Sequence, residues 1–159
     1  FKIGAKYLRK DIHRILQWDK KPIDQSVGGY SVSPDGTNCP IFVTYNKADD
    51  ISETTKYADR FITPNRIITI SKIRRTDKSP DILKIKNHKK NKMRLPLFIK
   101  KNDDEGISFY FVGDLTAVPD RFVNRKMKDD NGIEKPVVEM EFMTEKPVED
   151  GLYKYLTTA

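Results

Sequence analysis

The sequence predicts a single α+β domain, residues 1–159, built on a curved, mostly antiparallel sheet or open β-barrel with about two helices. The chain has 159 residues, a usual length for one hydrophobic core. Short runs rich in β-branched and aromatic residues recur between turn signals, which predicts about six or seven strands. Strands and helices do not alternate in a βαβ rhythm, so a doubly wound parallel sheet is not expected.

The N-terminal third predicts one helix, one loop and one strand. Residues 5–18 place their apolar side chains at helical spacing, which predicts a helix that ends before Pro22. Residues 26–40 are rich in Ser, Gly, Pro, Asp and Asn, which is typical of a loop. The run 41–45 (IFVTY) has the β-branched and aromatic composition of a buried strand.

The middle of the chain predicts a second helix after another strand. Residues 46–56 are polar and favour a connector, whereas the run 57–62 fits neither state clearly. Residues 66–72 alternate Ile with Thr and Ser, which predicts a strand. Ser79 followed by Pro is a strong helix start, because Ser suits the N-cap and Pro the first turn, so we expect a helix over 80–88.

The C-terminal half predicts two β-hairpins. Residues 95–101 and 107–115 flank a polar, Gly-containing turn, and 121–128 and 136–143 flank an Asp-Asn-Gly turn. We expect the tail, residues 147–159, to dock as a short strand or turn.

The net charge of +7 is concentrated in one segment. Residues 60–101 carry 14 basic and 2 acidic side chains, a local charge of +12, whereas residues 1–59 carry +1 and residues 102–159 carry −6. A block of this kind attracts a polyanion and makes binding weaken with salt. The alternative is a solvated lysine-rich face. The regularly spaced Ile and Leu residues within the block favour cations presented from ordered structure.

The sequence offers no enzyme motif. It contains no GxxxxGK[ST], GxGxxG, HExxH or GxSxG pattern, so we expect no catalytic residue and no cofactor in this domain. The lone cysteine, Cys39, excludes an internal disulfide and a zinc site with several thiolates, and we expect no metal site. No run approaches the roughly 20 apolar residues of a membrane span. Because the chain opens at Phe1, we expect it to be excised from a larger polypeptide.

Aromatic side chains and a carboxylate gather where the basic block begins. Tyr45 ends a predicted strand, and Tyr57, Asp59 and Phe61 follow within one short run. Aromatic faces stack nucleobases, and a carboxylate can accept a hydrogen bond from cytosine N4, so these four residues form a candidate pocket for an extruded base. The alternative is that Tyr57 and Phe61, at positions i and i+4, anchor a short helix to the core.

A second candidate is the segment of residues 74–79. Arg74 and Arg75 supply two guanidinium groups, and Ser79 supplies a hydroxyl at a predicted helix start. Arginine forks and helix N-termini both bind phosphate, so this segment is a candidate contact for a nucleic-acid backbone. The alternative is an exposed, charged loop.

These residues carry a resemblance to a known family. In order along the chain, the similar stretches are PIFVTYNK (40–47), TKYADRF (55–61), SKIRR (71–75), Ser79, LFIKK (97–101), Gly106 and FYFVG (109–113), with Arg9, Asp11 and Trp18 in the opening helix. Together they resemble the C-terminal domain that follows superfamily-2 helicase motors in bacteria. The architecture is similar to that of SauUSI-type, ATP-dependent type IV restriction endonucleases.

The resemblance implies an SRA/PUA-like target-recognition domain for double-stranded DNA that carries 5-methylcytosine or 5-hydroxymethylcytosine. It implies a base flipped into an aromatic pocket, which falls here on Tyr45, Tyr57, Asp59 and Phe61. Where the family more often has an acidic residue between Asp and Phe, this chain has Arg60. The DNA-binding candidates are then Lys47, Arg60, Lys72, Arg74, Arg75, Ser79, Lys89, Lys90, Lys100 and Lys101.

The resemblance also implies a larger parent enzyme. The partners of this domain would be the helicase and nuclease domains of the same polypeptide. Those domains would need ATP and Mg²⁺, and the enzyme would be located in the bacterial cytoplasm.

A second interpretation stays open at this point. The domain would then couple to the helicase motor, or bind another protein, and would touch the DNA backbone without reading bases.

Overall fold

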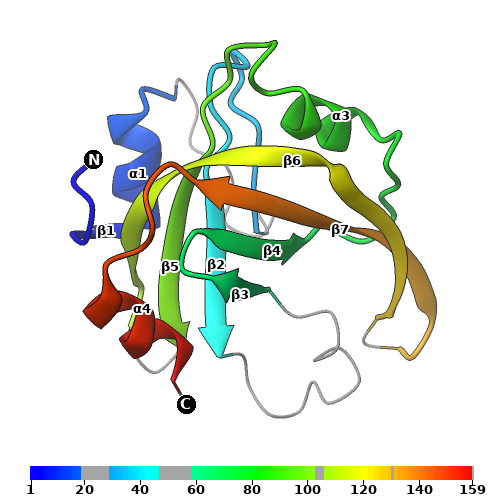
Figure 1. Ribbon diagram of the computed structural model, residues 1–159. Coiled ribbons are helices and arrows are strands. Elements are labelled where there is room, and N and C mark those ends of the chain that lie inside the picture. The colour runs from blue at the N-terminus through cyan, green and yellow to red at the C-terminus, as the bar shows by residue number, and fades with distance from the viewer. Residues whose placement is uncertain (19–28, 47–58, 103–105, 130, 159) are drawn as a thin grey trace.

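The computed structural model describes residues 1–18, 29–46, 59–102, 106–129 and 131–158. Within them it has seven strands and three helices around a strongly curled sheet that forms a half-barrel (Figure 1). In chain order the elements are β1 (Lys6–Leu8), α1 (Arg9–Ile15), β2 (Ile41–Asn46), β3 (Arg60–Thr63), β4 (Arg66–Ile70), α3 (Pro80–Lys86), β5 (Pro96–Asn102), β6 (Ser108–Lys128), β7 (Glu134–Thr144) and α4 (Asp150–Thr157).

The predicted fold class is confirmed. The strand order is β2-β5-β6-β7-β4-β3, with β1 paired to β6 outside this path. Every pairing among the described strands is antiparallel except that of β2 with β5, which is parallel. The parallel pair was not expected from local patterns, because its two strands are brought together by a long connection rather than a hairpin.

Both predicted hairpins form, but they share one strand. β5 pairs with β6, and β6 pairs with β7 next to a hydrogen bond from the Gly132 N–H to the Asp129 carbonyl at 2.9 Å. The expected break between residues 115 and 121 is absent, because β6 continues through an irregularity between Ala117 and Phe122 and pairs with β7 on both sides of it. β6 therefore runs from Ser108 to Lys128 and contributes to both halves of the curled sheet.

The helix predictions need two corrections. The first helix is shorter than expected, because residues 6–8 pair with β6 as β1 and the helix is confined to Arg9–Ile15. The C-terminal tail forms α4 instead of a strand or turn. Glu149 caps this helix by accepting hydrogen bonds from the backbone N–H groups of Gly151 and Leu152 at 2.8 and 2.9 Å, and Leu156 is buried in the core.

The core has two apolar clusters because successive strand residues point to opposite faces of the sheet. On β5, Leu97 and Ile99 join the larger cluster, which α3 and α4 also enter. Phe98, between them in sequence, faces the smaller cluster beneath α1. No helix among the described residues is long and apolar enough to cross a membrane.

A buried histidine links the segment after α3 to β6. His88 is 4% exposed, and its Nε2 accepts a hydrogen bond from the backbone N–H of Ala117 at 3.0 Å. Nδ1 lies 3.0 Å from the carbonyl oxygen of Met93, so the proton belongs on Nδ1 and the ring is neutral. Burial lowers the pKa of His88 below its ordinary value, more than the Met93 carbonyl raises it.

We expect the free energy of unfolding to fall as the pH drops below about 6.5, the ordinary pKa of histidine. In that range the unfolded chain binds a proton at His88 while the folded chain does not, so acid favours unfolding. Urea titrations between pH 7.5 and 5 check this. His88→Gln, which cannot titrate, should show a shallower pH dependence; an unchanged dependence would contradict the assignment.

Candidate nucleic-acid interface

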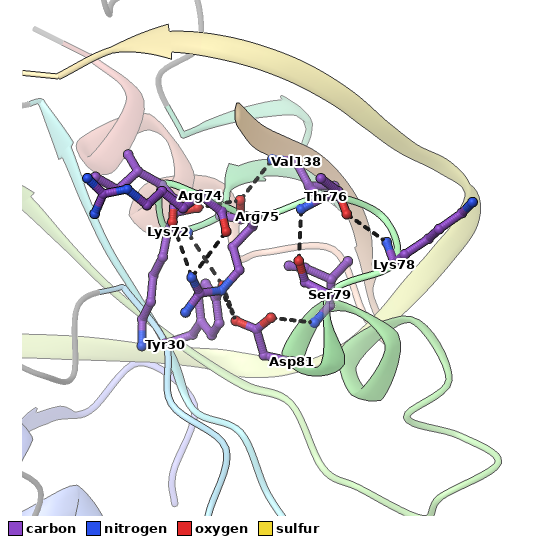
Figure 2. Close-up of polar contacts among 12 residues, drawn as sticks. Tyr30, Lys72, Arg74, Arg75, Thr76, Lys78, Ser79, Asp81 and Val138 are labelled. Atoms are coloured by element: carbon purple, nitrogen blue, oxygen red, sulfur yellow. Dashed lines mark hydrogen bonds and ion pairs between the residues drawn. The ribbon is translucent and has the colours of Figure 1, made fainter. Parts of the chain in front are cut away.

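The segment that follows β4 is held along β7 and leads directly into α3. Ser71 donates its backbone N–H to the Val138 carbonyl at 2.9 Å, and the Val138 N–H donates to Ser71 Oγ at 2.8 Å. Arg75 N–H donates to the Pro136 carbonyl at 3.1 Å. The backbone carrying Lys72, Arg74 and Arg75 is therefore fixed to the sheet (Figure 2).

Ser79 stabilises the end of the segment between β4 and α3 by a hydrogen bond within that segment. It occupies the N-cap position of α3, as the sequence predicts, but its side chain makes no capping hydrogen bond. Ser79 Oγ instead accepts a hydrogen bond from the backbone N–H of Thr76 at 2.9 Å (Figure 2). The hydroxyl thus stabilises the turn over residues 76–79, which directly follows the two arginines.

A tyrosine, a carboxylate and a guanidinium meet at the start of α3. Asp81 Oδ2 accepts hydrogen bonds from the Tyr30 hydroxyl and from Arg75 Nε, both at 2.8 Å (Figure 2). Partial burial raises the pKa of Asp81, but the hydrogen bonds from Arg75 and Tyr30 outweigh it and hold that pKa below its usual range. The carboxylate is therefore ionised and its charge is offset by Arg75.

These residues line a pocket of about 470 Å³. Lys72 projects beside Tyr30, with its ammonium 4.9 Å from the centroid of the Tyr30 ring. Burial, followed by the positive charge of Arg75, lowers the pKa of Lys72. Cations and hydroxyls dominate the lining, which consists of Tyr30, Ser31, Val32, Lys72, Arg74, Arg75, Ser79, Pro80, Asp81 and Lys84.

The structure thus brings four of the predicted DNA-binding residues to one place: Lys72, Arg74, Arg75 and Ser79. Lys89 and Lys90 are exposed in the segment that follows α3, and Lys89 lines a second pocket of about 220 Å³. Lys100 and Lys101 do not join this group. Their ammonium groups lie over the rings of Phe109 and Tyr155, at 5.2 and 4.7 Å from the centroids.

The aromatic candidates form a separate cluster. The rings of Tyr45 and Phe61 stack with centroids 6.0 Å apart, and Phe61 also meets Tyr153 edge to face at 5.4 Å. Tyr45 Oη accepts a hydrogen bond from the Phe61 backbone N–H at 3.3 Å. Rings at this separation contact each other directly, so no base lies between them in this arrangement.

The other candidates near this cluster are only partly described. Asp59 Oδ1 accepts a hydrogen bond from the Ile70 backbone N–H at 2.7 Å, and Arg60 forms an ion pair with Glu139 at 3.4 Å. Tyr57 and Lys47 lie outside the described residues. The alternative of a helix carrying Tyr57 and Phe61 is wrong at Phe61, which is in strand β3, although its 8% exposure does make it a core residue.

Six of the ten described residues that line the pocket are not among the predicted DNA-binding residues, and three of them, Tyr30, Asp81 and Lys84, carry ionisable side chains. Tyr30 lies in a predicted loop 51 residues from Asp81, and no local pattern links two such distant positions. Asp81 lies in the first turn of α3, where an acidic residue is common, and this position does not indicate that its carboxylate holds Arg75. Lys84 carried a usable signal, because it lies one helical turn after Pro80 and on the same side of the helix.

Among the described residues, no group of three or more His, Cys, Asp or Glu side chains is placed to hold a metal ion.

The sequence model of the family described as a domain of unknown function (DUF3427) matches residues 1–156. The chain belongs to this family. No curated protein matches the chain.

Two solved structures show what the DUF3427 domain is similar to in three dimensions. One contains the sulfur-binding and SRA domains of ScoMcrA complexed with phosphorothioated DNA, with a TM-score of 0.56 and 12% identity over 99% of this chain and 45% of that chain. The other is the DNA modification-dependent restriction endonuclease AspBHI, with a TM-score of 0.58 and 11% identity over 92% of this chain and 74% of that chain.

These similarities establish the fold of the DUF3427 domain. The half-barrel with its flanking helices is the SRA/PUA-like α+β fold that the resemblance implied. The chain spans less than half the length of the ScoMcrA structure that it matches.

Proposed function

We propose that the DUF3427 domain is a target-recognition domain for modified DNA that acts within a restriction enzyme. Support comes from the fold that it shares with AspBHI, named as modification-dependent, and with a ScoMcrA structure that contains phosphorothioated DNA. The observation that carries the proposal is the pocket beside α3, where Lys72, Arg74 and Arg75 line one concave, positively charged surface. Such a surface attracts DNA, and phosphate contacts fix the position of a protein on the duplex.

The finer proposal concerns the base that is read. We propose 5-methylcytosine or 5-hydroxymethylcytosine in double-stranded DNA, extruded into a pocket formed by Tyr45, Tyr57, Asp59 and Phe61. Extrusion would require the Tyr45 and Phe61 rings to separate, and Tyr45 is only half-buried. Asp59 accepts a hydrogen bond from the backbone of Ile70, two residues before Lys72, which lines the cationic pocket. A base pocket and a phosphate pocket would then be neighbours.

The parent protein is part of the same proposal. We propose a SauUSI-type, ATP-dependent endonuclease of the bacterial cytoplasm, in which helicase and nuclease domains use ATP and Mg²⁺ while this domain only binds DNA. The domain itself would have no catalytic role.

A second candidate function is supported by the stacked aromatic pair. Because Tyr45 and Phe61 pack on one another, the domain would bind the DNA backbone through its cations without reading a base, and would couple to the helicase motor. This candidate requires equal affinity for modified and unmodified DNA.

A titration with matched duplexes distinguishes the two functions. We expect the modified duplex to bind about tenfold more tightly, the discrimination that one good base contact provides. Tyr57→Ala should abolish this preference and leave salt-dependent binding of both duplexes. Tyr155→Ala, which removes an aromatic residue that is 41% exposed on α4, serves as the matched control and should keep the preference. If Tyr57→Ala unfolds the domain, Tyr57 is a core anchor instead.

A further inference from the structure

We propose that Arg75 is a preorganised site for one phosphate group of the DNA backbone, and that the acidic residue Asp81, with Tyr30, positions it. The inference rests on the proposed function and adds a specific phosphate contact to it. It has an unusual consequence: removing a negative charge from a DNA-binding surface should weaken DNA binding.

The guanidinium of Arg75 is fixed by three hydrogen bonds. Nε donates to Asp81 Oδ2 at 2.8 Å, and Nη1 donates to the carbonyl oxygens of Ile73 and Arg74 at 3.2 and 3.4 Å (Figure 2). Nη2 takes part in none of them. Because these bonds already restrict the side chain, binding a phosphate through Nη2 costs little further rotamer entropy.

Asp81 is itself held in place. The buried hydroxyl of Tyr30, a residue that is 3% exposed, donates to the same carboxylate oxygen at 2.8 Å. The other oxygen, Oδ1, accepts from the backbone N–H of Ile82 at 2.9 Å. Asp81 therefore cannot rotate away from Arg75 without leaving the Tyr30 hydroxyl without its acceptor, which would be costly in a buried position.

The surroundings suit a phosphate better than a base. Among the residues that the structure describes, four cations and one carboxylate line the pocket, and Arg75 offsets the charge of that carboxylate, Asp81. Arg74 and Lys84 both line this pocket beside Arg75, and, after backbone hydrogen bonds, the positive charge of Arg74 also lowers the pKa of Asp129. The Tyr30 ring is buried and Lys72 lies over it, so it offers no free face for stacking.

The test compares two substitutions that remove the same charge. Asp81→Asn frees Arg75 and should weaken binding of a duplex about fivefold to tenfold at low salt. For this variant, the slope of log affinity against log salt concentration should become less negative by about 1, which corresponds to the loss of one phosphate contact. Asp77→Asn, in the loop before α3, is the matched control and should bind as tightly as the wild type or more tightly. Asp81→Asn binding at least as tightly as the wild type would overturn the proposal.

A third variant keeps the test decisive if Asp81→Asn does not fold. Arg75→Lys retains the positive charge but loses the guanidinium fork, and should bind DNA about fivefold more weakly. Wild-type affinity in Arg75→Lys would overturn the proposal. Both modified and unmodified duplexes are used, so failure of the proposed function appears separately, as equal affinity of the wild type for the two duplexes.

Discussion

Replacing Arg74 and Arg75 together by alanine is expected to weaken binding of modified and unmodified duplexes alike, by roughly 30- to 100-fold at low salt. Both guanidiniums belong to the same pocket, and a charge-assisted contact to phosphate is stronger than a neutral hydrogen bond. Phosphate contacts carry no sequence information, so the ratio of the two affinities should stay constant. Fluorescence anisotropy with the two duplexes measures both quantities.

The matched control removes two positive charges from another part of the surface. Lys10→Ala combined with Arg14→Ala changes α1, which lies apart from α3 (Figure 1), and should weaken binding only slightly. Loss of affinity equal to that of the arginine variant would mean that net charge, and not the pocket, determines binding. A loss confined to the modified duplex would instead place base reading at these arginines.

The largest effect on stability is expected from Phe98→Ala. Phe98 is fully buried on β5, and its ring contacts those of Phe1, Tyr7, Phe42 and Phe111 at centroid distances of 5.1 to 6.4 Å. Removing a buried phenyl ring leaves a cavity, so we expect the free energy of unfolding to fall by about 3–5 kcal/mol. Urea unfolding measures the loss.

The control for Phe98→Ala is a large apolar residue on the surface. Ile107 is 72% exposed just before β6, so Ile107→Ala should change the free energy of unfolding by no more than about 0.5 kcal/mol. A Phe98→Ala loss as small as this would mean that the aromatic cluster beneath α1 contributes little to stability.

The elements that the sequence predicts well are those fixed by local physics. The strand at 41–45, the helix start at Ser79-Pro80 and the hairpin of β6 with β7 depend on local backbone preferences, and all three are present. The missed features depend on distant partners. Residues 6–8 have helical spacing, yet pairing with β6 makes them a strand, since hydrogen bonds from another part of the chain override a weak local preference.

The same distinction applies to the site. The local charge predicts a binding face within residues 60–101, and four residues of that segment, Lys72, Arg74, Arg75 and Ser79, line one pocket. It could not show that Tyr30 and Asp81 complete this pocket, because they meet only through the folding of a loop against α3. The sequence pattern also does not indicate that the rings of Tyr45 and Phe61 stack on each other, because this contact depends on the relative positions of β2 and β3 in the folded sheet.

The most direct test of the central claim is the affinity of the domain for a duplex with one modified cytosine relative to the same duplex without it, at several salt concentrations. Recognition of the modified base predicts that both affinities fall with salt while their ratio stays near tenfold, because the ratio comes from the base and the salt dependence from phosphates. Equal affinities at every salt concentration would contradict the claim and leave a module that binds only the DNA backbone.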